Sequence, residues 1–463
     1  MKIIFRKKSI IIILLIFFLF VRYITSMYKY EYKYQDFNKQ NAILKIIKVV
    51  EIKNNNNLYE VEYLKDKFIL NSKCNTLYRY GDILKADIVY YNFKEANKKE
   101  EFDYIKYLNS ILCIGSIYAK SDIKYISKEK DLYYYIYDFK YNLSIKIDKS
   151  LDKYSSLFKS LIYGEKSGEY EEELFRKIGI SHLLSVSGGN VLLIVMIILF
   201  LFKKTDKFKY FIVIITTILF CIFCNFEISI TRASIMIIIT YFLKLFDIEV
   251  KSIYIFILSL YIMIIYNPYY IYSASFILSF FSVSGIILFF PRLDSFIKYI
   301  FKFLKLKEIN YITNAIAIYF SILIAIFPIQ VHYFKSYNFL SIITNVIITG
   351  VVSIFNLIGI MFCTVIDIPY VSVILKYILI YFMKILFWFM EFLANFEMSI
   401  VFLPLNYLIF ILYYLFVFYF FYKDSTLFRN KLFKYKKIIN IVIILTLLLS
   451  VIYCIYNVFF NKI

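Results

Sequence analysis

The sequence predicts a polytopic α-helical membrane protein, with about 11 transmembrane helices and a small extracytoplasmic β-barrel domain of the OB type near the N-terminus. Hydrophobic residues make up 61% of the 463 residues, whereas soluble domains contain about 45–50%. Apolar runs of about 20 residues, the length that crosses a bilayer core of about 30 Å, recur through the second half. A segment of short β-type runs separates the first apolar run from the others.

The N-terminus has the charge pattern of a membrane-inserted helix. Basic side chains within residues 2–8 precede the apolar run 10–21, and Arg22-Tyr23-Ile24-Thr25 follows in place of a small-residue cleavage site. We therefore expect residues 1–26 to form an uncleaved first transmembrane helix, with the N-terminus in the cytoplasm.

Residues 27–128 lack apolar runs of membrane length and are expected to form the extracytoplasmic β-domain. Runs rich in β-branched and aromatic residues occupy 42–52, 58–70, 83–91 and 111–119. Four asparagines at 54–57 and the pair Gly81-Asp82 mark loops between them. Short strands of this kind are typical of a small barrel. Such barrels often bind oligonucleotides, but the fold alone does not decide the function.

Two cysteines lie in this β-domain. On the extracytoplasmic side Cys74 and Cys113 are a candidate disulfide, because such bonds persist in oxidising compartments. Two unrelated buried thiols are the alternative. Cys221 and Cys224 have metal-type spacing without a partner pair nearby, so we interpret them as packing residues.

Residues 129–181 are predicted to form amphipathic helices at the outer membrane surface. Apolar residues from Leu151 to Ile162 share one helical face, with Lys153, Lys159 and Ser160 on other faces. An acidic stretch at 171–173 continues the helical pattern after a break between Gly164 and Gly168.

Residues 182–463 are predicted to form a multi-helix channel domain in the membrane. The expected spans are 182–202, 209–225, 229–246, 252–267, 271–290, 311–331, 338–366, 370–394, 404–422 and 438–458. With the first helix cytoplasmic at its N-terminus, the strongly basic loops between these spans fall on the cytoplasmic side. The net charge of +21 is therefore explained by topology, without requiring a nucleic-acid surface.

Several predicted spans carry polar stripes at helical spacing. Ser275, Ser279 and Ser282 follow one face of the sixth span. A second stripe in the eighth span consists of Asn345, Thr349, Ser353 and Asn356. Small polar residues commonly pack membrane helices together, whereas an unpaired amide facing lipid is costly. The stripes thus indicate either helix packing or a water-lined path.

Arg232 lies a few residues from the outer end of the fourth span. An arginine inside a span is expensive and often marks a pathway or an ion pair. Extension of its side chain to the membrane surface is the competing interpretation.

The stretch that joins the soluble region to the membrane is unusually polar. It contains His182, and the further pathway candidates in it are Ser185, Ser187, Gly188, Gly189 and Asn190. The Ser-Gly-Gly-Asn run is a poor helix former, and a broken helix is tolerated only beside protein or a water-filled cavity. His332 ends the seventh span on the same side. Since no carboxylate or thiol accompanies the two histidines, we expect neither a metal site nor a cofactor.

An ordered set of motifs in these segments resembles the ComEC/Rec2 family of competence proteins, which form the inner-membrane channel for transforming DNA. Residues 181–188 resemble the family signature H-L-L-A-I-S-G-L-H-V. Residues that resemble the later motifs of the family follow in the right order. They are Arg232-Ala233-Ser234-Ile235-Met236, Phe276-Ile277-Leu278-Ser279-Phe280, Pro328, His332 and Asn345. Tyr80-Gly81-Asp82 and Phe102-Asp103-Tyr104 resemble parts of its extracytoplasmic β-domain. The resemblance covers most of residues 1–350.

The chain also departs from the family pattern. Gly189-Asn190 stands where the family usually has Leu-His, and Gly350 where a proline is usual. Larger members carry a C-terminal metallo-β-lactamase-like domain, and we expect it to be absent here because no His-x-His-x-Asp run occurs.

The resemblance implies a DNA-uptake channel in the bacterial plasma membrane, without catalytic residues, that passes single-stranded DNA along the polar helices. Its expected partners are single-stranded DNA, the bilayer, a DNA receptor, a separate nuclease and a cytoplasmic helicase, with a homo-oligomer as a further possibility. The lack of an ATP-binding P-loop pattern assigns the driving force to partners. A transporter or flippase for another solute, and a non-channel membrane subunit, remain the alternatives.

Overall fold

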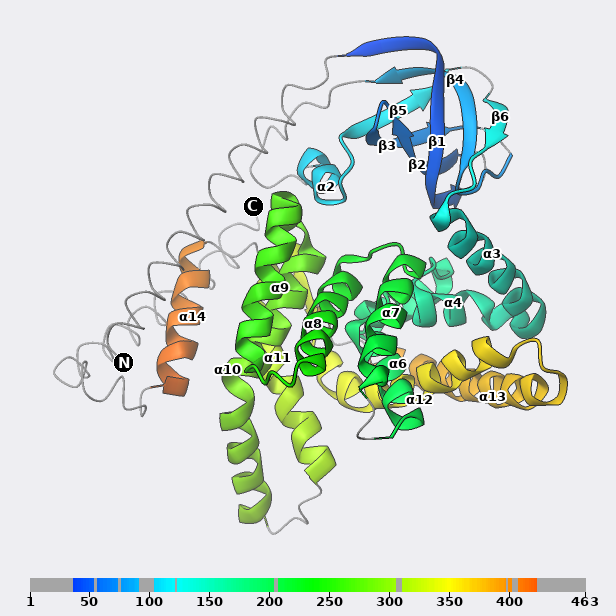
Figure 1. The fold of residues 1–463 in the computed structure, drawn as a ribbon. Helices are drawn as coiled ribbons and strands as arrows, with labels where there is room; N and C mark the ends of the chain where they lie inside the picture. Colours follow the sequence, from blue (N-terminus) through cyan, green and yellow to red (C-terminus); the bar gives the residue numbers. More distant parts are fainter. Residues whose placement is uncertain are drawn as a thin grey trace. The chain divides into compact units, whose positions relative to one another are not determined.

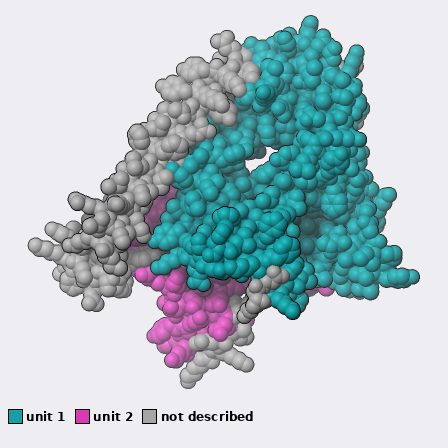
Figure 2. All heavy atoms as spheres, viewed as in Figure 1, with its two compact units in different colours: residues 1–168, 184–277, 355–381 teal, residues 169–183, 278–354, 382–463 magenta. Residues whose placement is uncertain are grey.

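A barrel of β-strands followed by a series of α-helices makes up this computed structural model (Figure 1). The structure describes residues 36–53, 56–73, 76–90, 104–120, 123–203, 207–304, 310–396, 399–401 and 407–422. They fall into two units, coloured in Figure 2. Residues 1–168, 184–277 and 355–381 make up unit 1, and residues 169–183, 278–354 and 382–463 make up unit 2. The barrel belongs entirely to unit 1.

The strands of the N-terminal region close into the predicted barrel. They are β1 (Phe37–Lys53), β2 (Asn56–Tyr63), β3 (Asp66–Ser72), β4 (Asp82–Tyr90) and β5 (Gly115–Ala119). Their order is β1-β2-β3-β5-β4, and β1 pairs with β4 to close the ring. β3 and β5 run parallel, while the other neighbours are antiparallel. β6 (Lys124–Lys128) extends the sheet along β4. Five strands are the size of an OB-type barrel.

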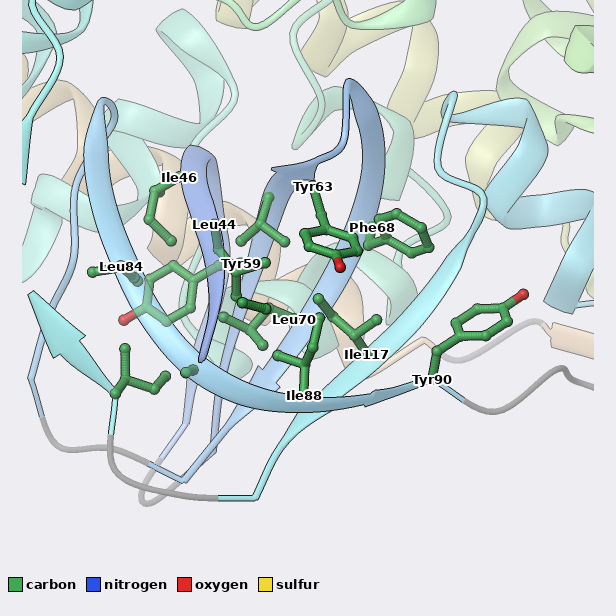
Figure 3. Packing of buried hydrophobic residues seen from close by; sticks show 14 of the residues in the cluster. Leu44, Ile46, Tyr59, Tyr63, Phe68, Leu70, Leu84, Ile88, Tyr90 and Ile117 are labelled. Atoms are coloured by element: carbon green, nitrogen blue, oxygen red, sulfur yellow. The ribbon is translucent and has the colours of Figure 1, made fainter. Parts of the chain in front are cut away.

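Apolar side chains fill the barrel (Figure 3). Leu44, Leu84 and Ile88 are fully buried and point towards one another. At one end Phe68 packs edge-on against Tyr90, with ring centroids 5.9 Å apart. A small barrel packed in this way holds no internal ligand, so any partner of the β-domain contacts its outside.

The structure corrects the prediction of a single strand at residues 58–70. Leu64 and Lys65, with φ of 52° and 68°, form a tight turn between β2 and β3, which pair from Asn57 with Ser72 to Tyr63 with Asp66. Two positive φ values in a two-residue loop indicate a type I′ turn, which normally uses Asn and Gly. Because neither residue type is present, the sequence carries no turn signal here.

Cys113 lies between α2 (Tyr104–Ser110) and β5. Its side chain is fully buried, packed with Ile69 and Leu108, and burial raises the pKa of the thiol. Cys74 lies outside the described residues, so the bridge between these two cysteines stays a prediction.

The segment after the barrel is helical, as predicted. It comprises α3 (Leu132–Leu151), the short 3₁₀ turn η1 (Asp152–Tyr154), α4 (Ser155–Tyr163) and α5 (Glu169–Lys177). The sequence placed Ser160 away from the apolar face, but in the structure Ser160 is fully buried. Its hydroxyl donates to the Leu184 carbonyl at 2.6 Å, so protein covers both sides of the second half of α4.

Apolar helices make up most of the remaining chain. They are α6 (Gly188–Leu201), α7 (Phe208–Phe223), α8 (Ile228–Leu245), α9 (Ser252–Tyr266), α10 (Ala274–Phe303), α11 (Asn310–Phe334), α12 (Ser341–Val365), α13 (Pro369–Ala394) and α14 (Tyr407–Tyr422). Within the described residues, 5 helices (α8 and α10 to α13) are long and apolar enough to cross a membrane, and the other four are shorter. This confirms a multi-pass membrane protein. The count of about 11 spans is not confirmed, since the predicted spans 1–26 and 438–458 lie outside the described residues.

The Tyr80-Gly81-Asp82 motif joins the barrel to α3. Gly81 has a φ of 83°, and a Cβ there would lie 2.4 Å from the Glu129 carbonyl oxygen, so the close approach requires glycine. The Tyr80 hydroxyl donates to the Asp131 carboxylate at 2.8 Å. Asp131 is the N-cap of α3, accepting from the Tyr134 backbone N–H, and it also pairs with Lys45 of β1 at 3.0 Å.

These contacts set the ionisation of Asp131. Burial alone would raise the pKa of Asp131, but the hydrogen bonds from Tyr80, Tyr134 and Lys45 outweigh it, so the pKa is lowered. The carboxylate therefore contributes stability at pH values above the unfolded pKa of about 4. That contribution is lost as the pH falls through the lower folded value.

We predict that Asp131→Ala loosens the start of α3. Loss of the cap costs about 1 kcal/mol, and loss of the partly exposed ion pair costs up to about 1 kcal/mol. Hydrogen exchange of the first-turn amides of α3 should therefore be roughly 5- to 30-fold faster at neutral pH. Asp131→Asn keeps a capping oxygen and is the control: it should lose less protection and remove the dependence on pH below about 4. Equal exchange in both variants and the parent would contradict this role.

Candidate functional site

The candidate site is the start of α6, where the soluble region meets the apolar helices. The sequence predicted a helix from residue 182, but α6 begins at Gly188. Before it, Ser181–Leu183 form a short 3₁₀ turn, η2, and the chain is then irregular. Ser187 is extended and caps the helix by accepting from the Gly189 N–H at 3.2 Å. The two glycines therefore lie in the first turn and do not interrupt a longer helix, which corrects the expected break.

Asn190 connects this first turn to the end of α4. Its side chain is 2% exposed, and its amide nitrogen donates to the carbonyls of Leu161 and Ile162 at 2.7 and 3.3 Å. Because those carbonyls can only accept, the amide oxygen faces the other way and accepts from Asn356 at 2.9 Å. Asn190 thus satisfies carbonyls that the end of α4 would leave without partners.

The second half of α12 packs closely against α4 around this amide pair. A Cβ at Gly359 would lie 2.6 Å from Cδ1 of Ile162 and 3.0 Å from Phe158. The Phe158 ring meets Phe355 and Phe362 edge-on, with centroids 5.9 and 6.0 Å away. The absence of a side chain at Gly359 thus allows α12 to approach α4 closely enough for Asn356 to reach Asn190.

Arg232 of α8 lies beside the same first turn. A Cβ at Gly188 would be 2.8 Å from Cβ of Ala233 and 3.7 Å from Nη2 of Arg232, so α6 and α8 are in close contact here. The guanidinium also lies 3.9 Å from the Met236 sulfur. The positive end of the α6 dipole and a fixed cation therefore converge, which is an arrangement suited to an anion. Ser185, Ser187 and Gly189 are exposed at this end.

The predicted polar stripes have different surroundings. Ser282 and Asn345 each donate to a carbonyl one turn back in their own helix, at 2.6 and 2.8 Å, so the Ser282 hydroxyl and the Asn345 amide nitrogen find a partner without a second helix. Ser275 and Thr349 are exposed, and Ser279 is half-buried. Asn356 is buried against Asn190. Asn356 thus joins α12 to α6, whereas the bond of Asn345 stays within α12; the sequence grouped both asparagines as candidates for lining the path.

The histidines have no metal-binding surroundings in the described part of the chain. His182 is exposed in η2. His332, near the end of α11, packs edge-on against Phe410 with ring centroids 5.4 Å apart. No group of three or more His, Cys, Asp or Glu residues that could hold a metal ion occurs among the described residues. Cys221 and Cys224 are buried free thiols.

Lys140 is a site residue that the sequence analysis missed. It is buried on α3, and its ammonium donates to the Phe223 carbonyl at the end of α7 at 3.1 Å. The nitrogen also lies 5.1 Å from the centroid of the Tyr163 ring, and burial lowers the pKa of Lys140. Its helical spacing with the buried residues Leu143 and Ile147 was the available signal.

One comparison with known proteins gives a match. A family model described as "Competence protein" matches residues 161–426, a range that begins at the α4 carbonyl bound by Asn190 and includes Arg232. No curated protein and no solved structure matches the chain.

We predict that Asn190→Ala destabilises the protein more than Asn356→Ala. The first leaves two α4 carbonyls and the Asn356 amide nitrogen without a partner, at a cost of about 2–3 kcal/mol, whereas the second leaves only the Asn190 amide oxygen without its donor, at a cost of about 1 kcal/mol. Thermal unfolding in detergent should rank the variants in this order. The double variant should lose less than the sum, because the two amides share a bond. Equal or additive losses would contradict the arrangement.

A second prediction compares the two adjacent glycines. In Gly188→Ala the new methyl meets the short Ala233 side chain, so the backbone must shift, at a cost of about 1–3 kcal/mol. Gly189→Ala is the matched control, because that position is exposed and the nearest atom to a new Cβ is the Ser187 hydroxyl at 3.1 Å. The apparent Tm in detergent should fall for the first variant only. A larger loss in Gly189→Ala would refute the close contact of α6 with α8.

Proposed function

This chain belongs to the competence protein family and so has a role in DNA uptake for competence, and we propose that it forms the path by which single-stranded DNA crosses the membrane. The matched residues 161–426 run from the end of α4 to beyond α14. The proposal places the path at the start of α6, next to α8.

The observation that carries the proposal is the convergence of two positive groups at an exposed helix start. The first-turn N–H groups of α6 and the Arg232 guanidinium lie side by side, with Nη2 3.7 Å from the position of a Cβ on Gly188. The backbone of DNA presents a phosphate at every nucleotide, and helix N-termini and arginines are the groups that bind phosphate best. One such contact in apolar surroundings would hold a strand in register without reading its sequence.

The remaining candidates suit movement of a strand more than capture of it. Ser185, Ser187 and Gly189, at or just before the start of α6, are exposed, as are His182, Ser275 and Thr349 elsewhere. All six are neutral or weakly basic. A conducting path needs contacts strong enough to admit its cargo and weak enough to release it. Neutral hydroxyl and backbone groups meet both needs for a polyanion. Asn190 and Asn356 would support the path from behind.

The β-domain would receive the strand on the extracytoplasmic side, with the N-terminus of the chain in the cytoplasm. Its outer surface carries the exposed aromatic residues Tyr118 and Tyr125, which are 39% and 56% exposed, and the lysines of β6 lie next to the second. Aromatic rings beside basic groups bind single strands through stacking and charge. A nuclease, a DNA receptor and a cytoplasmic helicase would act as separate partners.

We predict that Arg232→Ala lowers uptake of fluorescently labelled DNA by roughly tenfold, which corresponds to about 1.4 kcal/mol for a lost contact with a charged group. Arg232→Lys keeps the charge and should retain most uptake, while Arg232→Met fills similar space without charge and should behave as Arg232→Ala. Uptake would be measured in competent cells, with the amount of protein in the membrane determined for each variant. Normal uptake by Arg232→Ala at normal protein level would mean that Arg232 packs helices and contacts no DNA.

A further inference from the structure

Helices α12 and α13 raise a question of membrane topology that the proposed path does not answer. Both are long and apolar enough to cross a membrane by length and composition, and the sequence predicts that both do. They are joined by the short loop 366–368. Two crossings would put this loop on the side opposite the β-domain.

The segment from α3 to α5 gives a fixed reference for sidedness. α3 starts at Asp131, which is bonded to the barrel residues Lys45 and Tyr80. Of α3, α4 and α5, α3 alone has the length to span a bilayer, and it does not qualify because it carries five charged side chains. Residues 132–180 therefore stay on the side of the membrane that holds the β-domain.

The start of α12 is tied to the end of this segment. Within unit 2, the Thr344 hydroxyl donates to the Ile178 carbonyl at 3.1 Å. The Asn338 amide, just before α12, donates to the Lys177 carbonyl. Gly179 has a φ of 76°, and a Cβ on it would lie 2.8 Å from Cβ of Ser341. The first turn of α12 is thus on the side of the β-domain.

The end of α12 is tied to the same segment. Within unit 1, Lys146 of α3 pairs with Asp367 of the connecting loop at 2.6 Å. α4 packs on the last turns of α12 through Phe158 and Ile162, as described above for Phe362 and Gly359. A helix whose two ends both contact residues 132–180 has not crossed the membrane.

The far end of α13 returns to this segment as well. Within unit 2, the Tyr170 hydroxyl of α5 donates to the Glu391 carboxylate at 2.7 Å. The Tyr170 ring stacks on Phe387, with centroids 6.4 Å apart. In addition β7 (Ser336–Asn338), before α12, pairs with β8 (Ser399–Val401), after α13.

We propose that α12 and α13 form a hairpin that lies along the membrane on the side of the β-domain and crosses nowhere. Charge supports this arrangement. The loop 366–368 carries Asp367 and no basic residue, unlike the basic loops expected in the cytoplasm. If α13 crossed, Lys376 and Lys384 would lie within the hydrocarbon core, where a lysine is costly.

The outward face of α13 contacts the bilayer leaflet on that side. The face opposite its buried residues Leu379 and Met390 presents a stripe of large exposed side chains. The stripe consists of Tyr370, Ile374, Tyr377, Tyr381, Ile385 and Trp388. Tyrosine and tryptophan are enriched where headgroups meet acyl chains, and a helix lying in that layer buries such a stripe while its lysines reach water.

Cysteine labelling tests the sidedness of the loop. In a chain whose six native cysteines are replaced, Ile368→Cys keeps the Lys146–Asp367 pair intact. A membrane-impermeant maleimide should label it from the same side as Lys124→Cys of β6. Glu249→Cys, in the α8–α9 loop, is the control for the opposite side. Labelling of Ile368→Cys together with Glu249→Cys overturns the proposal.

Tryptophan depth gives an independent test that keeps the native cysteines. Trp388 is the only tryptophan in the chain, so the native protein is compared with the double variant Tyr381→Trp, Trp388→Phe in vesicles of lipids brominated at shallow or deep acyl positions. The two positions lie about 10 Å apart along the helix. A hairpin along the leaflet predicts the same preferential quenching by shallow bromines at both positions.

A crossing helix places position 381 near the bilayer centre, so stronger quenching there by deep bromines than at Trp388 overturns the proposal. The quenching measurement also distinguishes the hairpin from a crossing helix if the maleimide labels Ile368→Cys from neither side of the membrane. If no brominated lipid quenches either tryptophan while Tyr381→Cys forms disulfide-linked dimers, a second copy of the chain occupies the stripe and the lipid contact is refuted. Neither readout depends on DNA uptake.

Discussion

The hydrogen bonds of the Asn190 amide join three helical segments of unit 1 at one side chain. In apolar surroundings no water donates to the last carbonyls of α4. The Asn190 amide nitrogen is their hydrogen-bond donor instead. Its oxygen takes the amide of Asn356, so α4, α6 and α12 meet at one side chain. The start of α6, with its Ser187 cap and its close contact to α8, is positioned by this one group. Because α6 and α8 are in close contact, this also fixes the position of Arg232 beside the start of α6.

Burial separates two classes of polar residue that look alike in the sequence. Asn190 and Asn356 are 2% and 6% exposed, and the hydrogen bonds of their amide groups run between helices. An amide committed in this way cannot turn to a passing ligand without leaving carbonyls unsatisfied. Ser185, Ser187 and Gly189 lie on the exposed side of the same turn. The chain thus places two buried, mutually bonded amides behind an exposed polar surface, an arrangement that the proposed path for a polyanion would require.

The sequence predicted the membrane class, the small barrel and the positions of most apolar helices, because hydrophobic runs depend on local composition alone. It could not predict contacts set by partners distant in the chain. The helical pattern predicts that Ser160 lies away from the apolar face, yet its side chain is buried and donates a hydrogen bond to the Leu184 carbonyl. The turn at Leu64 and Lys65 lacks glycine, since strand pairing imposes its conformation. The proposed position of α12 and α13 on one side of the membrane could not be predicted from charge, for a different reason. If two successive helices do not cross, every other loop stays on the side where the sequence placed it, so the distribution of basic loops is the same in both topologies.

Closure of the barrel has a consequence for neighbours in a crowded membrane. Each of β1 to β5 pairs with at least two neighbours, whereas β6, at the end of the described sheet, pairs with β4 alone. That strand is five residues long and has a lysine at each end. Proteins confined to a bilayer meet edge to edge far more often than proteins in solution. A short edge bearing like charges resists joining to its copy, which protects the domain from sheet-to-sheet aggregation while its side chains stay open to a partner.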